Sequence, residues 1–94
     1  IREVIKNKTE LEYFDVVGPI CETGDFLGKN VKLGQLKEND LIIIESAGAY
    51  GSVMSSNYNS RPPAGEVLTY NNEIFLLREK ESIEDQIARE FIPF

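Results

Sequence analysis

The chain has 94 residues, of which 41% are hydrophobic and 28% charged, a composition that suits one small globular domain and excludes a disordered chain. Its formal net charge of −6 argues against nucleic-acid binding, because contacts with phosphates require a basic surface. No apolar stretch approaches the roughly 20 residues of a membrane span, and the start lacks the apolar core of a signal peptide, so no membrane partner is expected.

The numbers of cysteines and histidines restrict the cellular compartment and the kinds of site that are expected. The single cysteine cannot form an internal disulfide, which favours a reducing, cytoplasmic setting. With no histidine and one cysteine, the soft ligand set of zinc sites is absent, and no metal site is predicted. The chain starts at Ile1 rather than at methionine, which suggests processing, a missing upstream part or a cut fragment.

The first part of the chain predicts two short strands, at residues 3–5 and 11–17, joined by a polar turn at residues 6–10. Gly18-Pro19 ends the second strand, because proline has no N–H to donate to a neighbouring strand. The sequence CETGD, residues 21–25, follows as a glycine-containing turn.

The next stretch predicts a small loop at residues 26–28 and a short edge strand at residues 31–33. The composition of residues 37–40 is typical of a turn. It precedes Leu-Ile-Ile-Ile at residues 41–44, a short and largely β-branched run that indicates a strand buried on both faces.

The second half contains the clearest predicted elements. Residues 47–65, rich in glycine and serine, are long for a bare connection and are therefore either functional or mobile. Strands at residues 66–70 and 73–78 flank Asn71-Asn72, which suits the primed turn of a hairpin because asparagine tolerates positive φ.

One helix is predicted near the C-terminus. Ser82 and Asp85 form a variant of the capping box, and Ile83, Ile87 and Phe91 are spaced to share one helical face. Five to seven short strands, one long loop and this helix predict a mainly β fold: a small antiparallel β-barrel or sandwich with one C-terminal helix, in a single domain.

Cys21 is the first candidate for chemistry. A free cysteine is often a small buried hydrophobic residue. Here Glu22 and Asp25 lie beside it, and like-charge repulsion disfavours a thiolate. The chain has no histidine for a Cys–His pair, so the chemical role that remains is a neutral thiol acting as general acid.

Tyr50, in the stretch AGAYG, is the second candidate. It is either a core tyrosine at a strand end or a ligand-binding hydroxyl, and the glycines on both sides favour function because they allow backbone to approach a bound group closely. The run MSSNYNSRP, residues 54–62, offers short polar donors and one fixed cation, but taken alone it reads as a solvated polar loop.

Taken together, these stretches resemble one family. DVVGP followed by CETGD, then AGAYG, MSSNYNSRP and EVL, occur in this order along the chain. The series is similar to the C-terminal domain of diaminopimelate decarboxylase, a pyridoxal-phosphate-dependent decarboxylase of the alanine-racemase-like fold type. The resemblance runs from about Asp15 to the terminal helix, and MSSNYNSRP is its most specific part.

The resemblance implies roles for three residues. In that family the cysteine of this motif donates a proton, which implies that Cys21 is the catalytic proton donor. The adjacent glutamate contacts the distal amino group of the substrate, which implies that Glu22 binds substrate. The tyrosine of AGAYG contacts cofactor and substrate, which implies that Tyr50 binds both pyridoxal 5'-phosphate and the substrate.

Other site residues are less directly implied. Asp25 is interpreted as an acceptor that shapes the loop, and the polar run supplies scaffolding for a wall of the site through Asn57, Asn59 and Arg61. The family carries its cofactor on an N-terminal (β/α)8 barrel, with a cofactor-binding lysine and a glycine-rich phosphate cradle, and neither is visible here. The lysines of this chain lie in polar or turn contexts, at positions 6, 8, 29, 32, 37 and 80.

Residues 1–94 are therefore expected to be the C-terminal β domain of an enzyme that converts meso-2,6-diaminopimelate to L-lysine and CO2 in lysine biosynthesis, and to be inactive alone. The family's cysteine loop reaches the active site of the other protomer, so a homodimer with a shared site is expected.

Two alternatives stay open. One is a related pyridoxal-phosphate decarboxylase of the same fold, acting on ornithine, arginine or carboxynorspermidine; these usually carry aspartate after the cysteine, so Glu22 favours the diaminopimelate branch. The other is a free-standing β-barrel binding module, with Cys21 buried and the long loop binding a partner.

Overall fold

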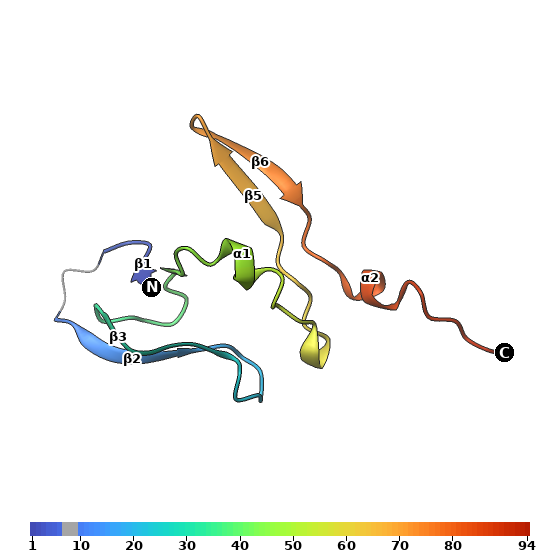
Figure 1. The fold of residues 1–94 in the computed structure, drawn as a ribbon, viewed down its shortest axis with the longest axis horizontal. Helices are drawn as coiled ribbons and strands as arrows, with labels where there is room; N and C mark the ends of the chain where they lie inside the picture. Colours follow the sequence, from blue (N-terminus) through green and yellow to red (C-terminus); the bar gives the residue numbers. More distant parts are fainter. Residues whose placement is uncertain (7–9) are drawn as a thin grey trace. The chain divides into compact units, whose positions relative to one another are not determined.

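The computed structural model describes residues 1–6 and 10–94, which form two compact units, residues 1–53 and 54–94. The predicted turn at residues 6–10 lies mostly outside the described residues. Among the described residues, the first unit has two two-stranded antiparallel sheets and one short helix, and the second has one such sheet and two short helices (Figure 1). The strands are β1 (Arg2–Glu3), β2 (Glu12–Val17), β3 (Phe26–Leu33), β4 (Ile42–Ile43), β5 (Glu66–Tyr70) and β6 (Glu73–Arg78). The helices are α1 (Gly48–Gly51), the 3-10 helix η1 (Tyr58–Ser60) and α2 (Ile83–Ile87).

A mainly β fold is thus confirmed. The described residues pair as β1 with β4, β2 with β3, and β5 with β6, and no closed barrel is formed among them. Nor is any described helix long and apolar enough to cross a membrane. The prediction that the chain is a single domain stays a prediction.

The β2–β3 hairpin differs most from expectation. The predicted loop at residues 26–28 and the short strand at residues 31–33 are one eight-residue strand, β3. Its register against β2 shifts twice, and Asn30 adopts a φ of 50° and donates its N–H to Asp15 Oδ1 at 3.0 Å. Gly28, in the predicted loop, and Asn30 instead lie next to register shifts within a continuous strand, where an extra residue is accommodated.

The predicted strand at residues 41–44 is shorter and less buried than expected. β4 covers two residues, both half-buried, while Leu41 and Ile44 are exposed. The expectation of burial on both faces is wrong for the described chain, because β4 pairs with β1 and has no second neighbouring strand among the described residues. The predicted turn at residues 37–40 is confirmed by the N–H of Asp40 donating to the carbonyl of Lys37 at 3.0 Å.

Two carboxylates attach the short strand β1 to its surroundings. Glu3 accepts a hydrogen bond from the N–H of Gly34, just beyond β3. Hydrogen bonds from its own N–H and from that of Gly34 lower the pKa of Glu3. Arg2 Nε lies 2.6 Å from Glu45 Oε1, and this hydrogen bond lowers the pKa of Glu45.

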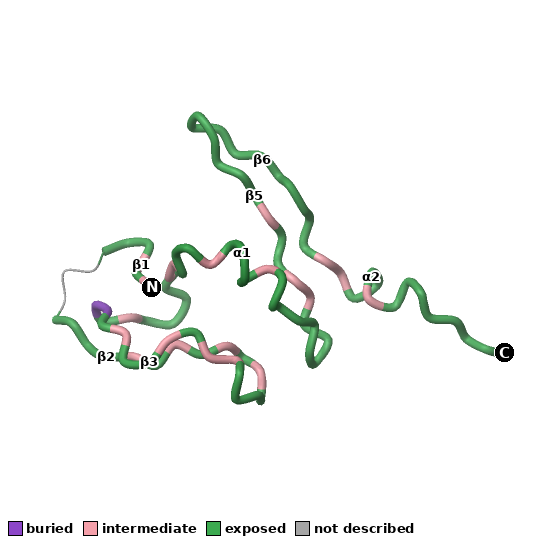
Figure 2. Tube along the Cα trace, in the orientation of Figure 1, coloured by how far each residue is buried: buried purple, intermediate pink, exposed green. Residues whose placement is uncertain are grey.

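The apolar core of the described chain is minimal. Leu33, 1% exposed, is its one fully buried large side chain among the described residues, and Figure 2 shows the buried segment at the end of β3. The local structure is therefore held mainly by backbone pairing and by hydrogen bonds to side chains, rather than by apolar packing.

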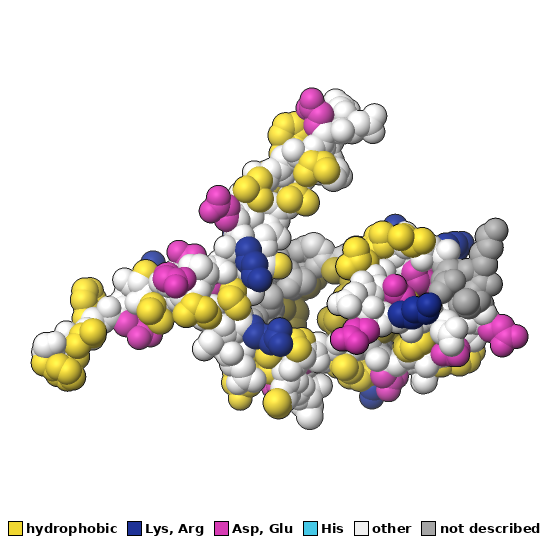
Figure 3. Space-filling view, turned by 180° about the vertical axis from the view of Figure 1, so that it is seen from behind, with side chains coloured by type: hydrophobic (Ala, Val, Ile, Leu, Met, Phe, Trp, Pro, Cys, Tyr) yellow, Lys and Arg dark blue, Asp and Glu magenta, His cyan; other side chains and the backbone are white. Residues whose placement is uncertain are grey.

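The β5–β6 hairpin confirms the prediction residue by residue. Asn71 and Asn72 have φ of 50° and 62°, as a primed two-residue turn requires. All of β6 is exposed, including four consecutive apolar residues, Ile74 to Leu77. Since successive side chains of a strand point to opposite faces, both faces of the hairpin present apolar side chains, some of which are visible in Figure 3.

Helix α2 begins as predicted and ends earlier. The Ser82 hydroxyl accepts the N–H of Asp85 at 3.1 Å, and the Asp85 carboxylate accepts the N–H of Ser82 at 2.8 Å, which completes the capping box. The N–H and the hydroxyl of Ser82 lower the pKa of Asp85. Because the helix ends at Ile87, Phe91 does not share its face and is 90% exposed.

The hairpin turn gives a test of the fold. We expect Asn72→Val in the complete protein to destabilise the β5–β6 turn by about 1–2 kcal/mol, because a β-branched residue resists positive φ. Asn72→Gly should be neutral or stabilising. The measurement is amide hydrogen exchange across the hairpin, with Thr69→Val, a β-favouring change within β5, as control. Equal exchange for the Val and Gly variants would contradict the primed turn.

Candidate active-site turn

The turn between β2 and β3, residues 18–25, carries two of the three predicted site residues. Its base is closed by Asp25, which accepts the N–H of Gly18 on its backbone carbonyl at 3.0 Å. The Asp25 carboxylate also accepts the N–H of Ile20 at 2.7 Å. This geometry agrees with the interpretation of Asp25 as an acceptor that shapes the loop.

The tip of the turn is ordered by hydrogen bonds of its own. The N–H of Glu22 donates to the carbonyl of Ile20 at 2.8 Å, and the N–H of Asp25 donates to the carbonyl of Glu22 at 3.1 Å. Glu22 Oε2 accepts the N–H of Gly24 at 2.6 Å, and its other oxygen accepts the Thr23 hydroxyl at 3.4 Å. A carboxylate has about four acceptor positions, so Glu22 keeps capacity for a cationic ligand.

Cys21 lies at this tip and is exposed. The interpretation as a buried hydrophobic residue therefore does not hold for the described chain. Cys21 and Glu22, neighbours in the sequence, both lie exposed on this turn. Such a pair can donate a proton from sulfur and bind a cation at the carboxylate.

Tyr50 lies on a different element. It belongs to α1, between Gly48 and Gly51, and is 74% exposed, so it is not a core tyrosine in the described chain. Within the described residues, no hydrogen bond joins Tyr50 to the turn that carries Cys21. Its hydroxyl is available to donate to or accept from a ligand.

The polar run at residues 54–62 lies in the second unit and contains η1. Asn59 and Ser60 adopt positive φ, at 58° and 59°, and the N–H of Tyr58 donates to Ser56 Oγ at 3.4 Å. The backbone therefore turns at Asn59 and Ser60, two consecutive residues in the left-handed region. The roles expected for Asn57, Asn59 and Arg61 in a site wall remain predictions.

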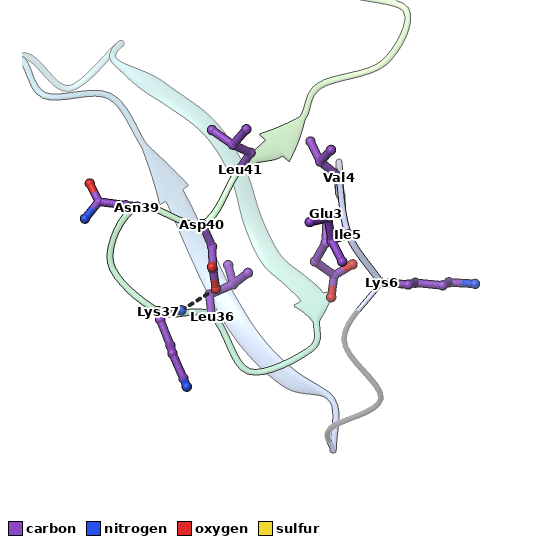
Figure 4. Close-up of a pocket in the computed structure, with 9 residues that line it drawn as sticks. All are labelled: Glu3, Val4, Ile5, Lys6, Leu36, Lys37, Asn39, Asp40 and Leu41. Atoms are coloured by element: carbon purple, nitrogen blue, oxygen red, sulfur yellow. Dashed lines mark hydrogen bonds between the residues drawn. The ribbon is translucent and has the colours of Figure 1, made fainter.

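A cavity of about 400 Å³ lies elsewhere in the first unit, between β1 and the turn before β4. Figure 4 shows the side chains of Lys6 and Lys37 pointing away from it. Its walls are mixed in polarity, and none of the predicted site residues lines it. No group of three or more potential metal-ligating side chains occurs among residues 1–6 and 10–94.

Comparison with known proteins places the chain in a family. Residues 1–48 match the family model described as "Pyridoxal-dependent decarboxylase, C-terminal sheet domain". The chain therefore belongs to the pyridoxal-dependent decarboxylases, as the sequence resemblance predicted, and pyridoxal phosphate is the cofactor of that family.

The relatives are diaminopimelate decarboxylases. That of Neisseria meningitidis serogroup A is 55% identical over 76 residues, which cover 81% of this chain and 18% of the relative. That of Vibrio cholerae is 47% identical and covers 88% of this chain and 20% of the relative. The crystal structure of the Helicobacter pylori enzyme complexed with L-lysine matches with a TM-score of 0.83 at 40% identity, covering 95% of this chain and 22% of that one. The chain thus spans about a fifth of the length of these relatives.

The residues present fit one side of a site for pyridoxal phosphate. The exposed Tyr50 hydroxyl can hydrogen-bond a polar group of the cofactor, and the flanking glycines leave room beside it. The described lysines, at positions 6, 29, 32, 37 and 80, are all exposed. Lys29 and Lys32 lie over aromatic rings, those of Phe26 and Tyr13.

One contributor to the site was missed from the sequence. Gly18 was interpreted only as part of a strand end, whereas a Cβ at this position would overlap the Asp25 carboxylate. The two residues are seven positions apart, and only the folded turn brings them into contact. The glycine before proline was the one local signal, and it did not identify the partner.

Proposed function

We propose that the chain is the C-terminal domain of a diaminopimelate decarboxylase, which converts meso-2,6-diaminopimelate to L-lysine and CO2 in lysine biosynthesis. The observation that carries the proposal is that Cys21 and Glu22 are both exposed on one internally hydrogen-bonded turn. The identity to diaminopimelate decarboxylases of other organisms supports it. Membership of an enzyme family favours this function over a free-standing binding module.

Cys21 supplies the proton. The bond between the α-carbon and the departing carboxylate breaks, CO2 leaves, and the electron pair stays behind at the α-carbon. The chemistry that pyridoxal phosphate supplies when bound is an electron sink for that pair. The Cys21 S–H then transfers its proton to the α-carbon, and solvent returns a proton to the sulfur.

Glu22 and Tyr50 bind the ligands. The Glu22 carboxylate pairs with the distal ammonium, the charge that distinguishes a diamino diacid from a monoamine, through a charge-assisted hydrogen bond. The Tyr50 hydroxyl contacts both cofactor and substrate. In the family that the chain resembles, an N-terminal (β/α)8 barrel holds the cofactor, and we expect the complete protein to hold it in the same way.

The test of the function is substrate choice by the complete protein. With pyridoxal phosphate added, we expect CO2 release from meso-2,6-diaminopimelate and little from ornithine, arginine or carboxynorspermidine. The 94-residue chain alone should release none, because the family holds the cofactor on the lysine and phosphate cradle of an N-terminal barrel. Preference for ornithine or arginine would overturn the diaminopimelate assignment.

Glu22→Gln tests the specificity residue in the complete enzyme. The amide oxygen still accepts the N–H of Gly24, so the turn is retained, while the charge that pairs with the ammonium is lost. A charge-assisted bond contributes roughly 1.5–3 kcal/mol, so KM should rise about 10- to 100-fold with cofactor binding preserved. Tyr50→Phe should differ by weakening cofactor binding as well.

Glu38→Gln is the matched control, because it removes one exposed carboxylate from another turn of the same unit. Its KM should equal that of wild type. An unchanged KM for Glu22→Gln would count against the role of Glu22 in recognising the distal ammonium.

Subunit mixing tests whether Cys21 acts across a two-fold dimer. Two inactive complete variants are combined under conditions of subunit exchange: Cys21→Ala, and one without the cofactor-binding lysine of the N-terminal domain. A mixed dimer then has one site with both groups and one with neither. Half of the dimers are mixed, so activity should return to about a quarter of wild type.

If Cys21 served its own protomer, every site in the mixture would lack one essential group. Dimers that exchange subunits, as shown by mass spectrometry of tagged protomers, and yet stay inactive would exclude action across the interface.

A further inference from the structure

Asp25 closes the base of the turn through two separate contacts. Its backbone carbonyl accepts the N–H of Gly18, and its side chain accepts the N–H of Ile20 at 2.7 Å. The second distance is short for an N–H···O bond, as expected when the acceptor carries a charge. Asp25 is half-buried, in contrast to the exposed residues 21–24 at the tip of the turn.

Gly18 provides the space that this carboxylate occupies. A Cβ on Gly18 would overlap both carboxylate oxygens of Asp25. The backbone of Gly18 does not have positive φ, so alanine suits its conformation, and the requirement for glycine there is a requirement for space. The Asp25 carboxylate therefore occupies the space that a side chain at position 18 would fill.

The hydrogen bond between the Ile20 N–H and the Asp25 carboxylate fixes the backbone one residue before Cys21. Ile20, whose N–H is bound by Asp25, directly precedes Cys21, whereas the Cys21 thiol makes no hydrogen bond among the described residues. The position of the sulfur thus depends on the backbone of the turn. Proton transfer requires donor and acceptor at contact distance, and a displacement of about 1 Å can cost two orders of magnitude in rate.

We propose that Asp25 is a positioning residue: its carboxylate, seated in the space left by Gly18, fixes the turn so that the Cys21 thiol is held at the α-carbon of the substrate. This proposal rests on the proposed function, in which Cys21 donates the proton.

The experiment uses the complete enzyme. Asp25→Ala should lower kcat about 10- to 100-fold. KM should stay within about twofold of wild type, because Glu22 keeps its own hydrogen bonds from the N–H of Gly24 and the hydroxyl of Thr23. Asp25→Asn, which keeps an acceptor oxygen, should recover most of that loss. A purely structural role would instead raise KM together with the fall in kcat, or lower the thermal midpoint of the whole enzyme, and neither is expected for Asp25→Ala.

Gly18→Ala tests the same contact with Asp25 chemically intact. It should lower kcat by displacing the carboxylate, yet add little to Asp25→Ala, since the overlap is then gone. Asp40→Ala is the matched control: Asp40 accepts the N–H of Lys37 at 2.7 Å in another turn, and its loss should leave kcat unchanged.

Hydrogen exchange of the Ile20 amide separates this proposal from the function on which it rests. Exchange should become faster in Asp25→Ala and Gly18→Ala than in wild type. If wild type releases no CO2 from diaminopimelate, or Cys21→Ala keeps full activity, the proposed function fails, and the catalytic consequence fails with it. Unchanged kcat in Asp25→Ala with an active wild type, or unchanged exchange at Ile20, would overturn the positioning role itself.

Discussion

The hydrogen bond from a backbone N–H to a carboxylate is the interaction on which most of the local structure of the first unit, and the start of helix α2, depends. Six of the described carboxylates make it, each where the chain turns, bulges or starts a helix. The pairs, with the donor first, are Gly34–Glu3, Asn30–Asp15, Gly24–Glu22, Ile20–Asp25, Lys37–Asp40 and Ser82–Asp85. Such bonds are roughly twice as strong as those between neutral groups. These bonds matter here because apolar packing contributes little: Leu33 is the one fully buried large side chain in the described part.

This interaction also explains part of the acidic composition. A net charge of −6 suggests a surface that repels anions, yet several of these carboxylates are engaged with the backbone of their own turns. Glu22 illustrates the consequence for a site. One carboxylate can order the tip of a turn and still have acceptor positions free for a cation, so recognition and local structure are compatible in one residue.

Local patterns could be predicted from the sequence, and patterns that depend on distant neighbours could not. The Asn71-Asn72 turn and the Ser82–Asp85 cap were correct, because each is decided by a few consecutive residues. The extent of β3 was missed because its bulges place loop-forming residues inside a strand. The burial of residues 41–44 was wrong because burial needs further strands that the described chain does not provide.

The same difference between local and long-range patterns applies to the candidate site. Cys21, Glu22 and Tyr50 were predicted as site residues from short motifs and stay predictions, whereas the fit between Gly18 and Asp25 required the folded turn. A turn held by its own hydrogen bonds does not need a surrounding core to keep its shape. The β5–β6 hairpin differs, because it presents exposed apolar side chains on both faces and, among the described residues, few hydrogen bonds to side chains order it. The candidate turn can therefore be well ordered in a chain whose described part buries little apolar surface.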